Sequence, residues 1–293
     1  MSDSLGTILT AIVTPFDADL KVDHRRLAQL ATYLVEHGSD GLVVAGTTGE
    51  APTLTDDEKI AITVTVLETV GDRCRVVIGS GSNDTAHSVR LTQRAEREGV
   101  DAALIVTPYY NKPPERGVIE HFRAVAAGTK LPIVVYNIPG RCGVNISPEA
   151  LATLYETENI VAVKQANPDL TETRRLRELC DMGVYAGNDD MLLDVMRMGG
   201  WGGICVASHV VGPQLAEMAR LVRVGDDRGA AAINRHLEQL YKTLFITVNP
   251  IPIKAALNLL GHDVGGLRLP LVTASDAEAE TVAAELRHLG LLA

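Results

Sequence analysis

The sequence predicts a (β/α)₈ barrel followed by a helical C-terminal region. Three observations predict it: eight short apolar runs occur along the chain, amphipathic stretches separate them, and the alternation stops after about residue 225. Eight successive β–α units are typical of this barrel, and 293 residues suit one barrel with a small addition. We therefore expect residues 1–225 to form the barrel and to carry the active site, and residues 226–293 to form a helical domain.

The apolar runs are short, several are rich in Val and Ile, and most lack alternation of polar and apolar residues. Such runs are typical of parallel strands that are buried on both faces. The eight predicted strands are Thr7–Val13, Gly41–Ala45, Arg75–Gly79, Ala102–Val106, Pro132–Tyr136, Ile160–Lys164, Val184–Gly187 and Gly203–Ala207.

Capping residues mark several helices between these strands. Asp23 predicts the start of a helix over residues 24–37, which Gly38 ends. Thr55 and Glu58 have the spacing of a capping box before the next helix. Further signals are Asp84 or Thr85 at a start, Gly99 at an end, and Ser147 with Pro148 at a start. In the tail, residues 226–248, 252–260 and 274–289 look helical, and we expect them to pack on the barrel or on a partner subunit.

A doubly wound open sheet is the alternative fold. That fold commonly carries a glycine-rich G-x-G-x-x-G turn after its first strand. Here the corresponding turn reads Thr14-Pro15-Phe16-Asp17, so the barrel is favoured.

Composition excludes several classes of protein. Apolar residues make up 46% and charged residues 22%, which excludes a disordered chain. The net charge of −10 and the lack of a basic run argue against nucleic-acid partners. The start has no signal-peptide pattern, no apolar stretch approaches 18 residues, and the four cysteines form no C-x-x-C pair. We expect a cytoplasmic chain with reduced thiols and no membrane contact.

Lys164 is the most informative candidate residue. It is the only one of seven lysines that directly continues an apolar run, so it is expected at the C-terminal mouth of the barrel, where such enzymes place their chemistry. Removal from water lowers the pKa of a lysine, and the neutral amine attacks a ketone to form a Schiff base. The alternative is a strand-end lysine in solvent or paired with an acid.

Neighbouring loops supply possible partners for such an amine. Tyr136 ends the adjacent strand, and its phenol could carry protons, although a core-edge tyrosine is the simpler interpretation. Thr47 and Thr48 lie between two glycines, where backbone N–H groups can bind a carboxylate or form an ordinary turn. Arg141 could bind a second carboxylate or be a solvated surface residue.

The Tyr109-Tyr110 pair lies in a Pro-bounded loop of a chain with 4% aromatic residues. It could serve as a lid, a catalytic relay or a subunit contact, or it could simply pack the loop. Metal catalysis is not supported, because only His209 among eight histidines falls at a predicted strand end and no H-E-x-x-H motif occurs.

Five ordered motifs together resemble one family. They are Gly46-Thr47-Thr48-Gly49-Glu50, Thr107-Pro108-Tyr109-Tyr110-Asn111-Lys112-Pro113, Tyr136-Asn137-Ile138-Pro139-Gly140-Arg141, Lys164, and Gly187-Asn188-Asp189-Asp190. This combination resembles the pyruvate-dependent class I aldolases, which include dihydrodipicolinate synthase and N-acetylneuraminate lyase. The resemblance covers nearly the whole chain, from about Ile8 to about Leu271.

Within that family the chain is most similar to the dihydrodipicolinate synthases. Arg141 matches the arginine that binds the carboxylate of aspartate semialdehyde in those enzymes. Two tail segments, Asn249–Leu257 and Leu267–Leu271, also look like synthase sequence. The resemblance implies condensation of pyruvate with L-aspartate 4-semialdehyde in lysine and diaminopimelate biosynthesis, no external cofactor, and a homotetramer built as a dimer of dimers.

The resemblance also assigns roles to residues. Lys164 would form the Schiff base with pyruvate, and Tyr136 would give and take protons. Thr47 and Tyr110 would complete a proton relay, with Tyr110 supplied by the neighbouring subunit. The expected substrate contacts are Thr48 and Ile204 on pyruvate, Arg141 on the semialdehyde, and Gly187.

Some positions depart from the family pattern. Gln165 stands where many synthases have Glu, and Cys205 stands where Ser is common. Lysine-inhibited synthases often have histidines and a glutamate where this chain has Asp56, Lys59 and His87, whereas Asn83 is kept. Lys59 would repel a lysine ammonium, so inhibition by lysine is expected to be weak or absent.

Two other functions remain open on the sequence. A sister aldolase acting on a sugar acid, such as neuraminate or a 2-keto-3-deoxy acid, would use the same Lys164 with a pocket for a polyhydroxy chain. A non-catalytic chain that binds a keto acid as a regulator would also keep the lysine. Turnover with a panel of aldehydes separates the three.

Overall fold

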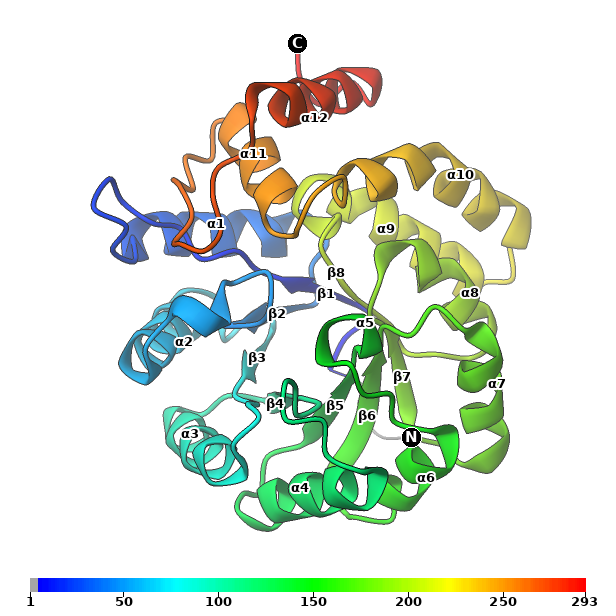
Figure 1. Ribbon diagram of the computed structural model, residues 1–293. Coiled ribbons are helices and arrows are strands. Elements are labelled where there is room, and N and C mark those ends of the chain that lie inside the picture. The colour runs from blue at the N-terminus through cyan, green and yellow to red at the C-terminus, as the bar shows by residue number, and fades with distance from the viewer. Residues whose placement is uncertain (1–4) are drawn as a thin grey trace.

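The computed structural model describes residues 5–293 and shows a closed barrel of eight parallel strands in chain order (Figure 1). The strands are β1 (Ile8–Ala11), β2 (Gly41–Val44), β3 (Arg75–Gly79), β4 (Ala102–Val106), β5 (Ile133–Asn137), β6 (Ile160–Gln165), β7 (Gly183–Ala186) and β8 (Gly202–Cys205). Strand β1 pairs with both β2 and β8, with Leu9 opposite Ile204, so the sheet has no edge. The predicted barrel is confirmed, and the open doubly wound alternative is wrong.

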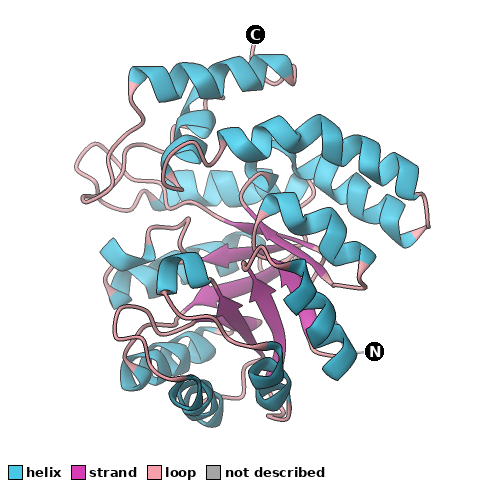
Figure 2. Cartoon of the chain, turned by 45° about the vertical axis from the view of Figure 1, so that its right-hand side comes forward, coloured by secondary structure: helices cyan, strands magenta, loops and turns pink. Residues whose placement is uncertain are grey.

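Helices surround the strands on the outside of the barrel (Figure 2). The barrel helices are α1 (His24–Glu36), α2 (Asp56–Val70), α3 (Thr85–Glu98), α4 (Glu115–Ala127), α5 (Pro139–Cys142), α6 (Pro148–Tyr155), α7 (Leu170–Leu179), α8 (Leu192–Arg197) and α9 (Ser208–Arg223). Two 3₁₀ turns, η1 (Ala51–Thr53) and η2 (Asp189–Met191), follow β2 and β7. The C-terminal helices are α10 (Asp227–Thr243), α11 (Ile251–Leu259) and α12 (Asp276–His288).

The predicted capping signals are found in the structure. The Asp23 side chain accepts from the Arg26 N–H at the start of α1. Thr55 and Glu58 form the complete capping box of α2. Asp84, rather than Thr85, caps α3. The remaining signals are also confirmed, with Ser147 capping α6 and Gly99 ending α3 in the left-handed conformation.

Strand ends differ from the predicted runs by one or two residues. The Ile160–Lys164 run extends to Gln165, and the Val184–Gly187 run is replaced by Gly183–Ala186. Apolar content does not mark a strand end, because the loops at the barrel mouth are also buried: Ala207, beyond β8, is fully covered. Arg75–Gly79 and Ala102–Val106 match their strands at both ends.

Alternate residues of each strand face two different cores, which explains the lack of polar alternation. One set packs against the surrounding helices, as Leu42, Val44 and Ile78 do. The other set fills the barrel interior, where Tyr136 lies among apolar neighbours. The interior residues include Leu9, Val43, Val77, Leu104, Val134, Ala162, Tyr185 and Ile204.

The C-terminal helices pack on one side of the barrel. Helix α10 packs against α9, and α12 packs against α10 and α11 (Figure 1). Helix α10 ends at Thr243, five residues before the predicted end, because residues 244–250 form a turn that leads into α11. The helical tail is thus present, while the domain boundary at residue 225 stays a prediction. No helix among residues 5–293 is long and apolar enough to cross a membrane.

Candidate active site

A cavity of about 670 Å³ opens at the C-terminal ends of the strands. Four predicted site residues line it: Thr47, Tyr110, Tyr136 and Arg141. They come from the loop after β2, the loop after β4, the end of β5 and α5, respectively. Elements far apart in the sequence therefore deliver these side chains to one place, as the barrel geometry predicts.

Lys164 and Tyr136 are neighbours in the barrel wall. Strands β5 and β6 pair with Tyr136 opposite Lys164. Both residues are buried, with exposed fractions of 5% and 6%, and the Lys164 Nζ lies 4.3 Å from the centre of the Tyr136 ring. Within residues 5–293, the Lys164 Nζ has no hydrogen-bond or ion-pair partner. Lys164 is not among the residues that line the cavity, but Tyr136, against whose ring its ammonium packs, is one of them.

The β5 end is held rigidly by the next loop. The Thr107 backbone N–H and hydroxyl both donate to the Tyr136 carbonyl, at 3.0 and 2.8 Å. The Cys142 thiol donates to the Thr107 carbonyl at 3.2 Å. These bonds join the segments that follow β4 and β5 at the backbone of Tyr136.

The Gly46–Glu50 loop forms a tight turn after β2. The Glu50 N–H donates to the Thr47 carbonyl at 3.1 Å, and the Ala51 N–H donates to the Gly46 carbonyl at 3.2 Å. Thr48 is buried, and its hydroxyl accepts a hydrogen bond at 3.0 Å from the Asn249 side chain. These bonds close the turn, and Thr47 is the threonine of the pair that lines the cavity.

Asn249 is a site residue that the sequence did not identify as one. Its backbone carbonyl accepts a long hydrogen bond of 3.5 Å from the Arg141 guanidinium, while its side chain holds Thr48. It lies 201 positions after Thr48 along the chain. Only the Asn249-Pro250 pair before an apolar run could have drawn attention to it.

Tyr109 and Tyr110 differ in how they meet the cavity. Tyr109 is 38% exposed and Tyr110 is 89% exposed, although both line the cavity. Tyr110 has a backbone φ of 70°, which is uncommon outside glycine. No hydrogen bond joins the side chains of Thr47, Tyr110 and Tyr136 within the described chain. The predicted relay is therefore not closed inside one subunit.

Ile204 and Gly187 belong to the barrel wall rather than to the lining of the open cavity. Ile204 is 1% exposed and faces the barrel interior together with Tyr136. A Cβ on Gly187 would lie 2.7 Å from the Ala166 Cβ, so a glycine is required for the two strand ends to approach. The Gly187 N–H donates to the Gln165 carbonyl at 2.7 Å.

Asp189, in the loop after β7, is another residue without a role predicted from the sequence. Its carboxylate is buried and accepts from the Val206 and Ala207 N–H groups, at 2.9 and 2.8 Å. Burial raises the pKa of Asp189, against these hydrogen bonds and the charge of Lys164. Burial likewise raises the pKa of Cys205. Asp189 thereby ties the β8 end to the β7 loop beneath the site.

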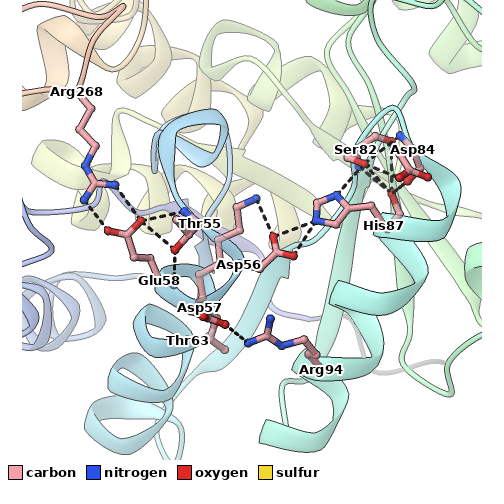
Figure 3. A network of polar contacts seen from close by, with 12 residues as sticks. Thr55, Asp56, Asp57, Glu58, Thr63, Ser82, Asp84, His87, Arg94 and Arg268 are labelled. Atoms are coloured by element: carbon pink, nitrogen blue, oxygen red, sulfur yellow. Dashed lines mark hydrogen bonds and ion pairs between the residues drawn. The ribbon is translucent and has the colours of Figure 1, made fainter.

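The outer wall of the cavity carries a charged cluster that includes the predicted regulatory positions. Figure 3 shows Asp56 pointing toward His87, whose Nε2 lies 2.9 Å from the carboxylate. Lys59 pairs with the same carboxylate at 3.8 Å, and Ser82 contacts the His87 Nδ1 at 3.1 Å. Burial lowers the pKa of Lys59, while Asp56 opposes that shift. Asn83 lines the cavity beside them.

His209, the strand-end histidine, is buried, and both of its ring nitrogens bond to backbone groups. Its Nδ1–H donates to the Val206 carbonyl at 2.8 Å, and its Nε2 accepts from the Val13 N–H at 3.2 Å. Burial lowers the pKa of His209 to about 4, so the ring is neutral at pH 7. In the part of the chain that the structure describes, no three His, Cys, Asp or Glu side chains are grouped to hold a metal ion.

Comparison with known proteins agrees with this geometry. Residues 4–289 match the model of the dihydrodipicolinate synthetase family. A 4-hydroxy-tetrahydrodipicolinate synthase of Moorella thermoacetica is 51% identical, covering 98% of this chain and 99% of that one. The synthase of Heliobacterium modesticaldum is 49% identical, covering 98% and 96%.

Solved structures show the same fold over the full length. Dihydrodipicolinate synthase from Cyanidioschyzon merolae with lysine bound has a TM-score of 0.96 at 40% identity, covering 98% of this chain and 99% of that one. The chloride-inhibited enzyme from Acinetobacter baumannii, complexed with pyruvate, has a TM-score of 0.96 at 34% identity, covering 99% and 100%. The chain belongs to the dihydrodipicolinate synthetase family.

Proposed function

We propose that the chain acts as a 4-hydroxy-tetrahydrodipicolinate synthase, a lyase that condenses pyruvate with L-aspartate 4-semialdehyde in lysine and diaminopimelate biosynthesis. The observation that carries the chemistry is the buried Lys164 amine, which has no partner within residues 5–293 and lies 4.3 Å from the Tyr136 ring. The names of the full-length relatives support the choice of substrates. Such an enzyme of amino-acid synthesis acts in the cytoplasm.

The reaction uses the lysine as a covalent catalyst. The Lys164 amine attacks C2 of pyruvate, and loss of water gives the Schiff base. Removal of a proton from C3 yields an enamine, whose C3 forms a bond to the aldehyde carbon of the semialdehyde. The amino group of that substrate then attacks the imine carbon, and the bond to Lys164 breaks. The enzyme is regenerated without an external cofactor.

Tyr136 is placed to move the protons of these steps. It lies beside Lys164 in register, and its ring borders the cavity. In our proposal Thr47 and Tyr110 complete its relay, and Tyr110 comes from the neighbouring subunit. The 89% exposure of Tyr110, together with its φ of 70°, supports a side chain that serves a second copy. The assembly is a homotetramer, arranged as a dimer of dimers.

The remaining residues bind substrate. Thr48 and the turn around it take the pyruvate carboxylate, and Ile204 packs against the reacting end of the molecule. Arg141, at the cavity wall, takes the carboxylate of the semialdehyde. Gly187 is proposed as a further substrate contact at the β7 end, where its lack of a side chain lets Ala166 approach closely.

Lysine inhibition of this chain is expected to be weak or absent. The relative from Cyanidioschyzon merolae has lysine bound, whereas here Lys59 and His87 share the carboxylate of Asp56. The ammonium of a bound lysine would be repelled by Lys59, and the Asp56 carboxylate already pairs with Lys59 and His87. Initial rates at increasing lysine concentration test this, and strong inhibition at low lysine would contradict it.

Pyruvate consumption against a panel of aldehydes tests the function. Aspartate semialdehyde, N-acetylmannosamine and glyceraldehyde are compared, with the Lys164→Ala variant as the control. We expect a clear preference for the semialdehyde that disappears in the variant. A preference for a sugar aldehyde would overturn the substrate and the role of Arg141, and no turnover with any aldehyde would indicate a binding protein.

A further inference from the structure

The loop that carries Thr47 and Thr48 ends in a buried charge. Glu50 is fully covered, and one of its carboxylate oxygens lies 2.7 Å from the Nζ of Lys254, on α11. The same ammonium donates to the Gly266 carbonyl at 2.7 Å and lies 4.2 Å from the centre of the Phe16 ring. The backbone N–H of Arg268 donates to the second Glu50 carboxylate oxygen at 3.0 Å. Each partner of this carboxylate therefore comes from the C-terminal part of the chain.

A second link joins the same loop to the same C-terminal part. The Asn249 side chain, one residue before Pro250 at the start of α11, donates to the Thr48 hydroxyl at 3.0 Å. The loop is consequently held at two points, Thr48 and Glu50. Both tethers lead to the segment that begins at Asn249, and neither belongs to the barrel strands.

Stability alone does not account for a buried ion pair at this place. Removing two charges from water opposes folding, and apolar side chains of similar size commonly stabilise a core as well or better. Burial lowers the pKa of Lys254 to about 8, although the Glu50 charge opposes the shift. Glu50 also has a backbone φ of 58°, so the carboxylate holds a turn that a non-glycine residue adopts reluctantly.

We propose that Glu50, Lys254 and Asn249 are positioning residues, through which the C-terminal helices set the geometry of the Thr47–Thr48 loop for the pyruvate carboxylate. This inference rests on the proposed function. None of the three needs to touch the reacting atoms. Their effect is on pyruvate binding: a displaced loop presents its hydroxyls and N–H groups at the wrong distance, while the Lys164 amine and the Arg141 site for the second substrate remain.

Two variants separate this role from folding. Glu50→Gln with Lys254→Met removes both charges together and leaves no unpaired ion in the core. Asn249→Ala removes the other tether without altering any charge. We expect each protein to fold, and we expect the KM for pyruvate to rise about tenfold while the KM for the semialdehyde stays within about twofold.

The matched control is Asp101→Asn at the opposite end of the barrel. Asp101 likewise pairs with one cation, Arg75 at 2.7 Å, and accepts from one backbone N–H, that of Val76 at 2.8 Å. Its loss should alter the unfolding midpoint but leave both KM values unchanged. If Glu50 only stabilises the fold, the Glu50→Gln/Lys254→Met variant should behave like Asp101→Asn: its unfolding midpoint should change and its KM for pyruvate should not.

Borohydride trapping of the pyruvate imine is measured on the wild-type chain first. Imine in the wild type, with half-saturation at higher pyruvate in the double variant and in Asn249→Ala, supports the inference. Imine in the wild type, with wild-type half-saturation in both folded variants, overturns the inference and leaves the proposed function intact. No imine in the wild type overturns the proposed function and the inference together.

Discussion

The structure contains two buried lysines that resemble each other in packing and differ in partners. Lys164 is 6% exposed and Lys254 is 1% exposed, and their ammonium groups lie 4.3 and 4.2 Å from an aromatic ring centre. The Lys254 Nζ is 2.7 Å from both the Glu50 carboxylate and the Gly266 carbonyl. Across residues 5–293, Lys164 has neither a carboxylate nor a carbonyl at such a distance.

The difference lies in the contacts of the two ammonium groups and not in their burial. A carboxylate and a carbonyl hold the Lys254 ammonium in one position, so its nitrogen already has acceptors within the protein. The Lys164 nitrogen is free of such contacts, and its residue lies one position before the C-terminal end of β6, the end at which barrel enzymes place their chemistry. The absence of an acceptor, rather than the depth of burial, distinguishes the candidate nucleophile.

Loss of Lys164 should have the largest effect. The Lys164→Ala variant is expected to lose activity by a factor on the order of 10⁴ or more, because the nucleophile itself is removed. Its unfolding free energy should fall by about 2 kcal/mol through the lost packing of the buried stem, since the Lys164 Nζ gives up no hydrogen bond or ion pair. Steady-state kinetics and urea unfolding measure the two quantities, and a variant with substantial activity would contradict the comparison.

Loss of Lys254 should show the opposite pattern. The Lys254→Ala variant leaves the Glu50 carboxylate buried without its cation, which is expected to destabilise the fold by about 3–5 kcal/mol. Urea unfolding at pH 7 checks the value. A change as small as that of Lys164→Ala would show that the Glu50–Lys254 pair does not hold the C-terminal part to the barrel.

Tyr136→Phe should separate proton transfer from amine chemistry. Removing the phenol hydroxyl is expected to lower kcat by about 10²–10³-fold, because a positioned acid–base group contributes that much. Lys164 is untouched, so borohydride should still trap the pyruvate adduct, although more slowly. An unchanged kcat would remove Tyr136 from the relay.

The buried His209 gives the smallest effect and a pH dependence. Its folded pKa of about 4 lies below the value of an unfolded histidine, because burial disfavours the charged ring. Above pH ~6.5 both states are neutral and nothing is lost. Between about pH 6.5 and 4, His209 is protonated in the unfolded chain but stays neutral in the folded one. The free energy of unfolding therefore falls as the pH falls.

This loss should amount to about 2 kcal/mol at pH 5 relative to pH 7. The His209→Gln variant lacks the titrating ring, so its unfolding free energy should fall less between the two pH values. Urea unfolding of both proteins at pH 7 and pH 5 measures the difference. Equal falls in the two proteins would assign the pH dependence to other groups.

Local patterns in the sequence were sufficient to predict the barrel and to single out Lys164 as a candidate. A lysine that ends an apolar run is recognisable without knowledge of distant contacts, and so is the Thr55–Glu58 capping box. The long-range tethers were not predictable in this way. Glu50 meets Lys254 more than 200 positions along the chain, and Asn249 meets Thr48 across a comparable separation.

Tyr110 shows a different limit of sequence analysis. Its place in the Tyr109-Tyr110 loop was predicted, but nothing in the sequence indicated that its side chain would be 89% exposed. The exposure of Leu269 and Val272, at 77% and 57%, could not be read from an apolar pattern either. Apolar side chains on the surface look like core residues in a sequence.

The most direct test of the account is to identify the lysine that forms the imine. The wild-type chain is incubated with pyruvate, reduced with borohydride and digested, and the peptides are analysed by mass spectrometry. We expect a reduced pyruvate adduct on the peptide that contains Lys164, and none on the peptide that contains Lys254. An adduct on another lysine, or no adduct at all, would contradict it.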